Sequence, residues 1–450
     1  MTTPAPAETE AHAAAKAAHV PRRWRNLMTL TGISVVDNTE ASAITTIFPS
    51  IATALNVSAA GLGALTALGK VASAPMGPAW VWLAGRIGRK ETLMATTLLG
   101  GFFGVLAGLS PSFGWLLVFN TLMVASVIGG TPIVNAVIAD SFEDKDRGKA
   151  AGVLYASING AASFVGPAIA TFTELGVDGW RYAMCTLGGI CILAGAVVAV
   201  GFKDPGVGAS EALLADLAED QRVPTRVTFR SVLSLFRIPT YSVMMLSRLL
   251  SGHLLIPIFG VTFLVSERGF HNATAAIVLI PFGIGYVIGA LGGGIGVSFV
   301  DRALPRTGRP LLLQTAQFAF AIFAFFGTQI PYSGGIAVYG VFWFLMAIAQ
   351  GLNVPVNRPI VAAVILPELR AQGFAIWLTI FETIGWALFA LVAGQLAAAI
   401  GIQTVFLWVV VGLMILNGLV LSALYVTYAR DADRVNNELT RRRTQVTGII

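Results

Sequence analysis

Hydrophobic residues fill twelve long runs of the chain, and short polar or charged stretches separate these runs. The runs lie at 26–55, 60–84, 92–109, 113–139, 150–172, 182–202, 241–266, 273–299, 311–330, 335–364, 371–399 and 402–428. About 20 apolar residues in helical conformation span the hydrocarbon core of a bilayer, whereas strands of a membrane barrel alternate over about ten residues. The pattern therefore predicts an all-α membrane protein with twelve transmembrane helices.

The composition argues against a soluble protein and against an enzyme. Hydrophobic residues make up 56% of the chain and charged residues 12%, while a soluble domain carries about 25% charged residues. The chain has four histidines, no His-Glu-x-x-His zinc motif and no Gly-x-Ser-x-Gly nucleophile motif. We expect a protein that is not an enzyme and that uses no metal or cofactor.

Positive charges predict the orientation in the membrane. If both termini and the long loop at 203–240 share one side, that side holds 24 of the 29 lysines and arginines. Basic loops remain in the cytoplasm. We therefore expect a multi-pass protein of the cell membrane with both termini cytoplasmic. Its basic charge would face anionic lipid headgroups and not nucleic acid.

The polar segments divide the chain into five parts. These are a tail at 1–25 that lacks the apolar core of a signal peptide, a six-helix bundle at 26–202, the loop at 203–240, a second six-helix bundle at 241–428, and a tail at 429–450. Within the loop, 209–220 is typical of an acidic amphipathic helix and 226–237 of a basic one. The apolar face of the second would comprise Phe229, Val232, Leu233 and Phe236 and would lie on the membrane surface.

The two bundles resemble each other. VWLAGRIGRK (81–90) matches VSFVDRALPRTGRP (297–310), and an arginine follows a proline by fifteen residues in each half, at Arg147 and Arg370. Each half also carries a glycine stripe with four-residue spacing, which lets helices approach closely. The stripes are Gly100, Gly104 and Gly108 in the first half and Gly285, Gly289 and Gly293 in the second. We expect two pseudo-symmetric six-helix bundles, as in transporters built from repeats.

Three segments together resemble the major facilitator superfamily. They are LAGRIGRK (83–90), IADSFEDKDRGKAAG (138–152) and DGWRYAM (178–184). The resemblance covers roughly residues 25–428 and implies two bundles that rock about a central cavity. It also implies a gating motif on the cytoplasmic side. Its candidate residues are Gly85, Arg86, Gly88, Arg89 and Lys90, with Asp301 and Arg302 in the second copy.

The sequence departs from the superfamily pattern at several points. Gly85 stands where the signature has an aspartate, although Asp301 keeps that acid in the second half, so Asp140 or Asp146 could take over the role in the first half. Asn120 stands where drug exporters carry an arginine. The segment NGAASFVGPAIA keeps the Gly166-Pro167 core of the superfamily's antiporter signature, which favours antiport.

Six charged residues fall inside the predicted helices. They are Asp37, Glu40, Lys70, Arg248, Arg358 and Glu382. A charge at the centre of a membrane helix costs about 2.5–3.5 kcal/mol. These side chains must therefore face a wet cavity or pair with one another.

Asp37 and Glu40 are candidates for proton coupling. They lie three residues apart and share a helix face, and two carboxylates in a partly dry site repel, which favours protonation of one. We expect both to face the cavity; the alternative is that Lys70 or Arg248 holds them ionised. His253 and Glu382 are further candidates for proton transfer, although His253 could equally serve as a packing residue.

Arg358 is the leading candidate for substrate binding, because a planar guanidinium holds carboxylates well. Glu382 could instead pair with Arg358 as a fixed brace. Asn353 and Asn357 share a helix face next to Arg358. The full set of substrate candidates is Asn38, Lys70, Asn159, Arg248, Asn353, Asn357, Arg358 and Trp386.

The predicted function is secondary active transport by alternating access. The resemblance favours a monomeric, proton-coupled antiporter that exports a small amphipathic or lipid-like compound. Its partners would be that small-molecule substrate, protons and the lipid bilayer. An alternative is uptake or facilitated diffusion of an organic anion held by Arg358 or Lys70. A second alternative is a channel or a receptor on the same scaffold.

Overall fold

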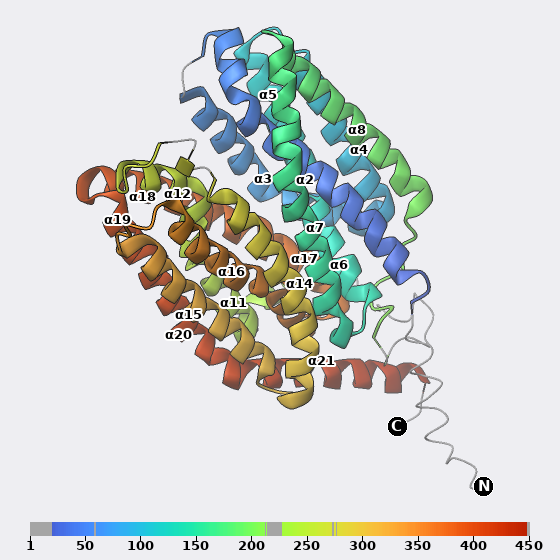
Figure 1. Ribbon diagram of the computed structural model, residues 1–450. Coiled ribbons are helices and arrows are strands. Elements are labelled where there is room, and N and C mark those ends of the chain that lie inside the picture. The colour runs from blue at the N-terminus through green and yellow to red at the C-terminus, as the bar shows by residue number, and fades with distance from the viewer. Residues whose placement is uncertain are drawn as a thin grey trace, which may run out of the picture.

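The computed structural model shows two helical bundles side by side (Figure 1). It describes residues 20–57, 60–211, 213, 227–271, 274–275 and 277–447. The first bundle comprises α2 (Arg23–Leu55), α3 (Ala60–Ile87), α4 (Arg89–Gly108), α5 (Phe113–Val127), α6 (Gly130–Ser141), α7 (Asp144–Ala170) and α8 (Gly179–Gly201). The second comprises α11 (Pro239–Leu249), α12 (Leu255–Ser266), α14 (Leu279–Ala303), α15 (Gly308–Gln329), α16 (Ile336–Val364), α17 (Arg370–Ala375), α18 (Glu382–Ile400), α19 (Ile402–Val405), α20 (Leu413–Val420) and α21 (Leu424–Thr447).

These helices account for the twelve predicted spans once broken spans are joined. Helices α5 and α6 form one span, Phe113–Ser141. The run from α11 through α12 is bent by 51° at a break that follows Pro257. A π-helical turn, Ile376–Phe381, joins α17 to α18, and a second one, Phe406–Gly412, joins α19 to α20. The architecture is the twelve-helix arrangement expected from the sequence.

By length and apolarity alone, seven of the described spans could cross a membrane, or eight with the bent pair. Helices α2, α3, α7 and α18 do not pass that test. Each of them contributes polar side chains to the central cavity described below, such as Asn38, Lys70, Asn159 and Glu382. These four helices thus line the cavity from both bundles.

Glycines set the closest helix contacts. A Cβ atom at Gly289 would lie 2.1 Å from the carbonyl oxygen of Ile348 on α16, and one at Gly285 would lie 2.3 Å from that of Phe344. The prediction that the second-half stripe permits close packing is confirmed. The two bundles touch in the same way along α7 and α14, where a Cβ at Gly152 would lie 2.6 Å from the carbonyl oxygen of Ala290.

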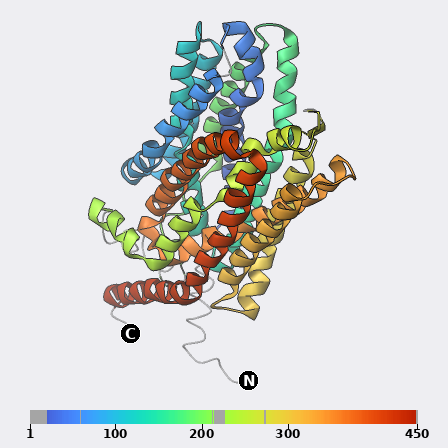
Figure 2. The same cartoon turned by 90° about the vertical axis from the view of Figure 1, so that its left-hand side faces the viewer.

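Both described ends of the chain lie at the same end of the molecule, which we call the termini face (Figures 1 and 2). Helix α21 runs across this face, roughly at right angles to the bundle (Figure 2). The short helix α10 (Phe229–Leu233) and a 3₁₀ turn, Ser234–Arg237, expose Phe229, Leu233 and Phe236. Val232, by contrast, packs against the buried core. The acidic helix expected at 209–220 lies largely outside the described residues.

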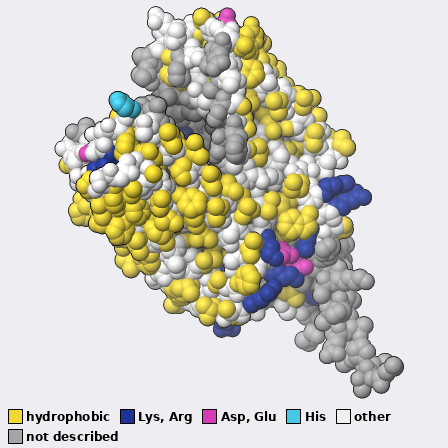
Figure 3. Space-filling view, viewed as in Figure 1, with side chains coloured by type: hydrophobic (Ala, Val, Ile, Leu, Met, Phe, Trp, Pro, Cys, Tyr) yellow, Lys and Arg dark blue, Asp and Glu magenta, His cyan; other side chains and the backbone are white. Residues whose placement is uncertain are grey.

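The surface agrees with membrane insertion. Hydrophobic side chains cover most of the body of the molecule in Figure 3, while lysines and arginines gather toward the termini face. The chain is thus a multi-pass membrane protein.

Candidate substrate cavity and buried acid pair

A polar cavity of about 360 Å³ lies between the two bundles. The first bundle lines it from α2, α3, α6 and α7, and the second from α11, α14, α15, α16, α18 and α20. Nine residues predicted from the sequence line this cavity: Asn38, Lys70, Asn159, Arg248, His253, Asn353, Asn357, Arg358 and Glu382. The structure therefore brings together residues that lie more than 300 positions apart in the chain.

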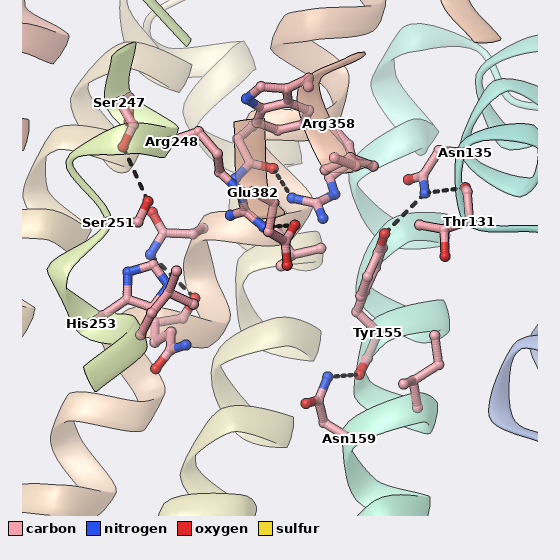
Figure 4. A pocket seen from close by; sticks show the side chains of 18 of the residues that line it. Thr131, Asn135, Tyr155, Asn159, Ser247, Arg248, Ser251, His253, Arg358 and Glu382 are labelled. Atoms are coloured by element: carbon pink, nitrogen blue, oxygen red, sulfur yellow. Dashed lines mark hydrogen bonds and ion pairs between the residues drawn. The ribbon is translucent and has the colours of Figure 1, made fainter. Parts of the chain in front are cut away.

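One ion pair crosses the second-half wall of the cavity (Figure 4). Arg248 on α11 donates to the Glu382 carboxylate at the start of α18. Arg248 thus takes the role of partner that one of the two interpretations of the sequence gave to Arg358. The brace between Arg358 and Glu382 is not formed, because α11 places Arg248 closer to the carboxylate.

Arg358 has no carboxylate partner within 4.0 Å among the described residues. It donates to Asn357 Oδ1 at 2.8 Å. Its guanidinium carbon lies 4.6 Å from the ring centre of Tyr155 on α7 and 5.1 Å from that of Trp377. Tyr155 is held by Asn135, whose amide donates to the tyrosine oxygen at 2.9 Å (Figure 4). Two aromatic rings therefore fix a guanidinium that still has donors to offer.

Lys70 stands opposite, on α3. Its Nζ lies 5.5 Å from the ring centre of Trp386, a cation–π contact. Trp386 does not line the cavity itself. Counted together, the described lining holds three lysine and arginine side chains, Lys70, Arg248 and Arg358, against the single carboxylate of Glu382. This part of the described cavity is therefore electropositive.

His253 lies in the short 3₁₀ turn, Gly252–Leu254, that joins α11 to α12. Its ring packs edge-on against Phe320, with ring centres 6.0 Å apart, and its Nδ1 is buried without a hydrogen-bond partner among the described residues. Asn353 accepts a hydrogen bond from Gln317 and donates to the carbonyl of Ala349 at 3.2 Å. Polar side chains of the cavity wall are thus mostly engaged, which preorganises the site.

The expectation that Asp37 and Glu40 face the cavity is wrong. Neither lines it; both are buried inside the first bundle, between α2, α4 and α8. Thr97 on α4 donates to Asp37 Oδ2 at 3.1 Å. Neither Lys70 nor Arg248 pairs with them, since Lys70 covers Trp386 and Arg248 binds Glu382. The physical reason is rotation about the helix axis, because Asn38 on the adjacent face takes the cavity position.

Glu40 occupies a recess that a glycine creates. A Cβ at Gly104 would lie 2.0 Å from Glu40 Oε1, and one at Gly100 would lie 3.6 Å from Oε2. The Cys191 thiol of α8 lies beside the carboxyl group. Among the described residues, both Glu40 oxygens and Asp37 Oδ1 are buried without a hydrogen-bond partner. The first-half glycine stripe thus makes room for an acid as well as for a helix.

The gating motif builds an ion-pair network at the termini face, and Asp140 occupies its centre. Arg89 donates to Asp140 at 2.6 Å and to Asp204 at 2.9 Å. Arg370 of the second bundle binds the same Asp140 at 3.2 Å. Of the two acids proposed to replace the missing aspartate at Gly85, Asp140 therefore makes the contacts; Asp146 pairs with Arg23 instead. Space around Gly85 is open, with no atom within 4 Å of a Cβ built there.

The second copy of the motif bridges the halves as well. Arg309 pairs with Asp301 at 2.7 Å and with Asp144 of the first bundle. The other motif residues are peripheral to this network. Arg86 stacks on Trp82 at 3.9 Å, Lys90 donates to the carbonyl of Ala199 at 2.6 Å, and Arg302 is exposed. Gly88 has φ 102°, a backbone conformation suited to glycine. Gly166 and Pro167 lie within α7, but their side-chain surroundings are outside the described residues.

Sequence reasoning missed Glu211, which joins both bundles. Its carboxylate accepts from Arg147 at 2.7 Å and from Arg370 at 2.5 Å, the two arginines that the internal repeat makes equivalent. Burial alone would raise the pKa of Glu211, but Arg370 and Arg147 outweigh it and lower the pKa to about 2. The repeat identified the two arginines, yet no pattern in the loop marked their shared partner.

Comparison with known proteins now identifies the family. The family model described as Major Facilitator Superfamily matches residues 30–343. The chain belongs to the major facilitator superfamily. Members of this superfamily are transporters and not enzymes, and they bind small-molecule substrates.

Solved structures of the superfamily share the fold. The proton:xylose symporter XylE bound to 6-bromo-6-deoxy-D-glucose matches with a TM-score of 0.66 and 14% identity, over 90% of this chain and 96% of XylE. The human organic anion transporter MFSD10 (TETRAN) matches with a TM-score of 0.67 and 16% identity, over 89% of this chain and 100% of MFSD10. A bacterial homolog of the human lysosomal transporter Spinster, in an inward-facing state, matches with a TM-score of 0.53 and 18% identity, over 93% of this chain and 98% of that homolog.

Proposed function

We propose that this member of the superfamily is a proton-coupled secondary transporter of a small organic anion. The observation that supports the substrate class is the charge of the cavity. Three cations face one carboxylate there, and the Arg358 guanidinium lacks an acidic partner among the described residues. A planar guanidinium fixed between two aromatic rings suits bidentate binding of a carboxylate or phosphate.

The polar lining favours this substrate class over a lipid-like compound. Asparagine, glutamine, serine and tyrosine side chains line the cavity alongside the cations. An apolar substrate would leave the lining atoms that have no protein partner among the described residues, such as Arg358 Nε and Gln350 Oε1, without water as well, at a cost of about 1–3 kcal/mol for each buried group. The prediction of export of an amphipathic compound thus gives way to the organic-anion alternative. MFSD10, named as an organic anion transporter, supports the same choice only as an analogy of fold.

Alternating access requires the termini face to open and close. The bundles are joined there by Asp140–Arg370, Asp144–Arg309 and the bridging Glu211. Basic residues gather on this side, so we infer that it faces the cytoplasm. Opening toward the cytoplasm would break all three connections and separate α7 from α14.

Asp37 and Glu40 are the proposed proton site. An isolated carboxylate in a dry environment is far costlier than a neutral carboxyl group, so the pair is inferred to hold at least one proton in this state. A Cβ at Gly130 would lie 3.6 Å from Asp37 Oδ2, and the next residue, Thr131, lines the cavity. The proton would therefore reach the pair through the α6 wall and not from the substrate position itself.

A ligand screen tests the substrate class. Purified protein is heated with a panel of organic anions, each matched with its neutral amide or ester. We expect anions to raise the melting temperature by mass action and their neutral analogues to leave it unchanged. Arg358→Gln should abolish the stabilisation, while Arg302→Gln, an exposed arginine of the termini face, should preserve it. Equal stabilisation by neutral analogues, or full retention in Arg358→Gln, would refute the proposal.

A further inference from the structure

A second groove lies on the termini face, apart from the central cavity. It encloses about 840 Å³ between the start of α11, the loop that joins α14 to α15, and α21. Its wall carries four arginines, all of them exposed: Arg237, Arg306, Arg430 and Arg434. Nothing in the proposed transport cycle uses these residues.

The charges of the groove are not balanced. Two acids, Asp431 and Asp433, line it with the four arginines, which leaves a net charge of +2. Asp431 is already engaged, because it accepts from the backbone N–H of Thr240 at 2.9 Å and lies 3.8 Å from Arg430 Nε. Among the described residues, Arg237, Arg306 and Arg434 have no carboxylate partner within 4.0 Å. The groove therefore suits an anion.

Exposed apolar side chains surround the arginines. Val426 of α21 lines the groove with 74% of its surface exposed, and Phe229 of α10, eight residues before Arg237 in the chain, is 79% exposed. Helix α21 runs across the end of the bundle, in the plane that a membrane surface would occupy (Figures 1 and 2). Arginines next to exposed apolar residues at this level are typical of segments that lie at the headgroup boundary.

We propose that this groove binds the phosphate headgroup of an anionic phospholipid from the leaflet at the termini face. The arginines would donate to the phosphate oxygens in charge-assisted pairs. Val426 and the α10 segment would contact the upper part of the acyl chains. A bound lipid would also connect α21 to the α14–α15 loop, next to the hydrogen bond of 3.0 Å that Arg309, at the start of α15, donates to Tyr428 of α21.

Native mass spectrometry of the full-length protein tests this site. The protein is released from micelles that contain equal amounts of phosphatidylglycerol and phosphatidylcholine, and retained lipid is counted. We expect preferential retention of phosphatidylglycerol. The triple change Arg237→Gln, Arg306→Gln and Arg434→Gln should weaken that preference by about 10- to 100-fold, since each arginine near an anionic surface contributes to binding. The corresponding triple change to lysine should keep most of it.

A second triple variant controls for net charge. Arg22→Gln, Arg25→Gln and Lys145→Gln remove the same charge from exposed positions outside the groove. If this control loses the preference as strongly as the groove variant, the site is refuted. Displacement of the lipid by millimolar inorganic phosphate would also overturn it, because the groove would then be a free-phosphate site. If the groove variant does not fold, Arg306→Gln alone, in an exposed loop, must still lower lipid retention.

Discussion

The molecule contains two clusters of charged groups within its membrane-spanning part, and they are built in opposite ways. In the cavity, Glu382 is paired with Arg248, and Arg358 and Lys70 lie near it. Inside the first bundle, Asp37 and Glu40 have a hydroxyl and a thiol as neighbours but no lysine or arginine partner among the described residues. In both clusters, a charge in a low-dielectric environment has a high free-energy cost, which neighbouring groups must reduce. The first is neutralised in part by an opposite charge, and the second, as proposed above, by a proton.

This difference separates two functions that a shared site would combine. In the proposed mechanism, the cluster rich in cations would attract an anionic substrate without needing a proton. The acid pair would exchange protons without touching the substrate. The proposed coupling therefore acts through the walls of α2 and α6 and not by direct competition for one position. Removing charge from each cluster should have different consequences, which the following experiments compare.

The largest expected effect is loss of coupling when an acid of the first bundle is neutralised. Glu40→Gln should abolish proton-driven accumulation of the substrate in proteoliposomes, a loss of at least about 10²-fold as for essential acid–base groups. Counterflow without a pH gradient should persist, because the cavity is unchanged. The melting temperature should stay close to that of the wild type, since no cation loses its partner. Asp37→Asn should have the same effect. Full proton-driven accumulation in the double variant, Asp37→Asn with Glu40→Gln, would show that another residue couples proton and substrate movement.

The same kind of substitution in the cavity should reduce stability. Glu382→Gln leaves Arg248, Arg358 and Lys70 without a carboxylate in the cavity lining. Breaking a buried pair costs about 3–5 kcal/mol, and we expect about 2–3 kcal/mol because the Glu382 side chain is 35% exposed. Thermal unfolding in detergent measures this. Arg248→Leu combined with Glu382→Leu should recover part of the loss; a double variant less stable than either single variant would contradict the pairing.

The sequence predicted the twelve spans and two bundles because apolar runs and repeated motifs carry that information locally. It also predicted most of the cavity, since charged residues in a membrane helix must face water or a partner. It could not give the rotation of α2. Ser34 and Asn38 face the cavity while Asp37 and Glu40 face α4 and α8, and both faces are buried in protein, so polarity alone does not distinguish them. Nor could it show that Arg248, and not Arg358, binds Glu382, because that choice depends on the packing of α11 against α18.

Gly104, whose missing side chain leaves room for Glu40, offers a sharper test of the acid cluster in the first bundle. Gly104→Ala would place a Cβ 2.0 Å from Glu40 Oε1, so the carboxyl group must move. Such overpacking costs about 1–3 kcal/mol, and we expect about 2 kcal/mol from denaturation curves. Gly189→Ala on α8 is the matched control, because no atom lies within 4 Å of its Cβ position. Combining Gly104→Ala with Glu40→Ala should restore stability, and additive losses would show that Gly104 serves helix packing alone.

Glu211 extends the paired arrangement to the termini face and gives the smallest expected effect. Its pKa is lowered from 4.5 to about 2 in the folded protein, where burial is outweighed by Arg370 and Arg147. Because the pKa is lowered, ionised Glu211 stabilises the closed termini face fully above pH 4.5, and this contribution is lost as the pH falls toward 2.

The variant Glu211→Gln removes this stabilising contribution at every pH. Because Arg370 keeps Asp140 and Arg147 keeps Asp144, we expect a loss of only about 1–2 kcal/mol. Spin labels at the exposed positions Glu91 of α4 and Arg302 of α14, close to the termini face, would report the separation of the bundles. The variant at pH 7 should show a larger open fraction than the wild type. The wild type should also open further between pH 5 and pH 3, whereas the variant should change less over that interval. If the two proteins open in parallel as the pH falls, carboxylates other than Glu211 control closure, and Asp140 with its two arginine partners is the next to test.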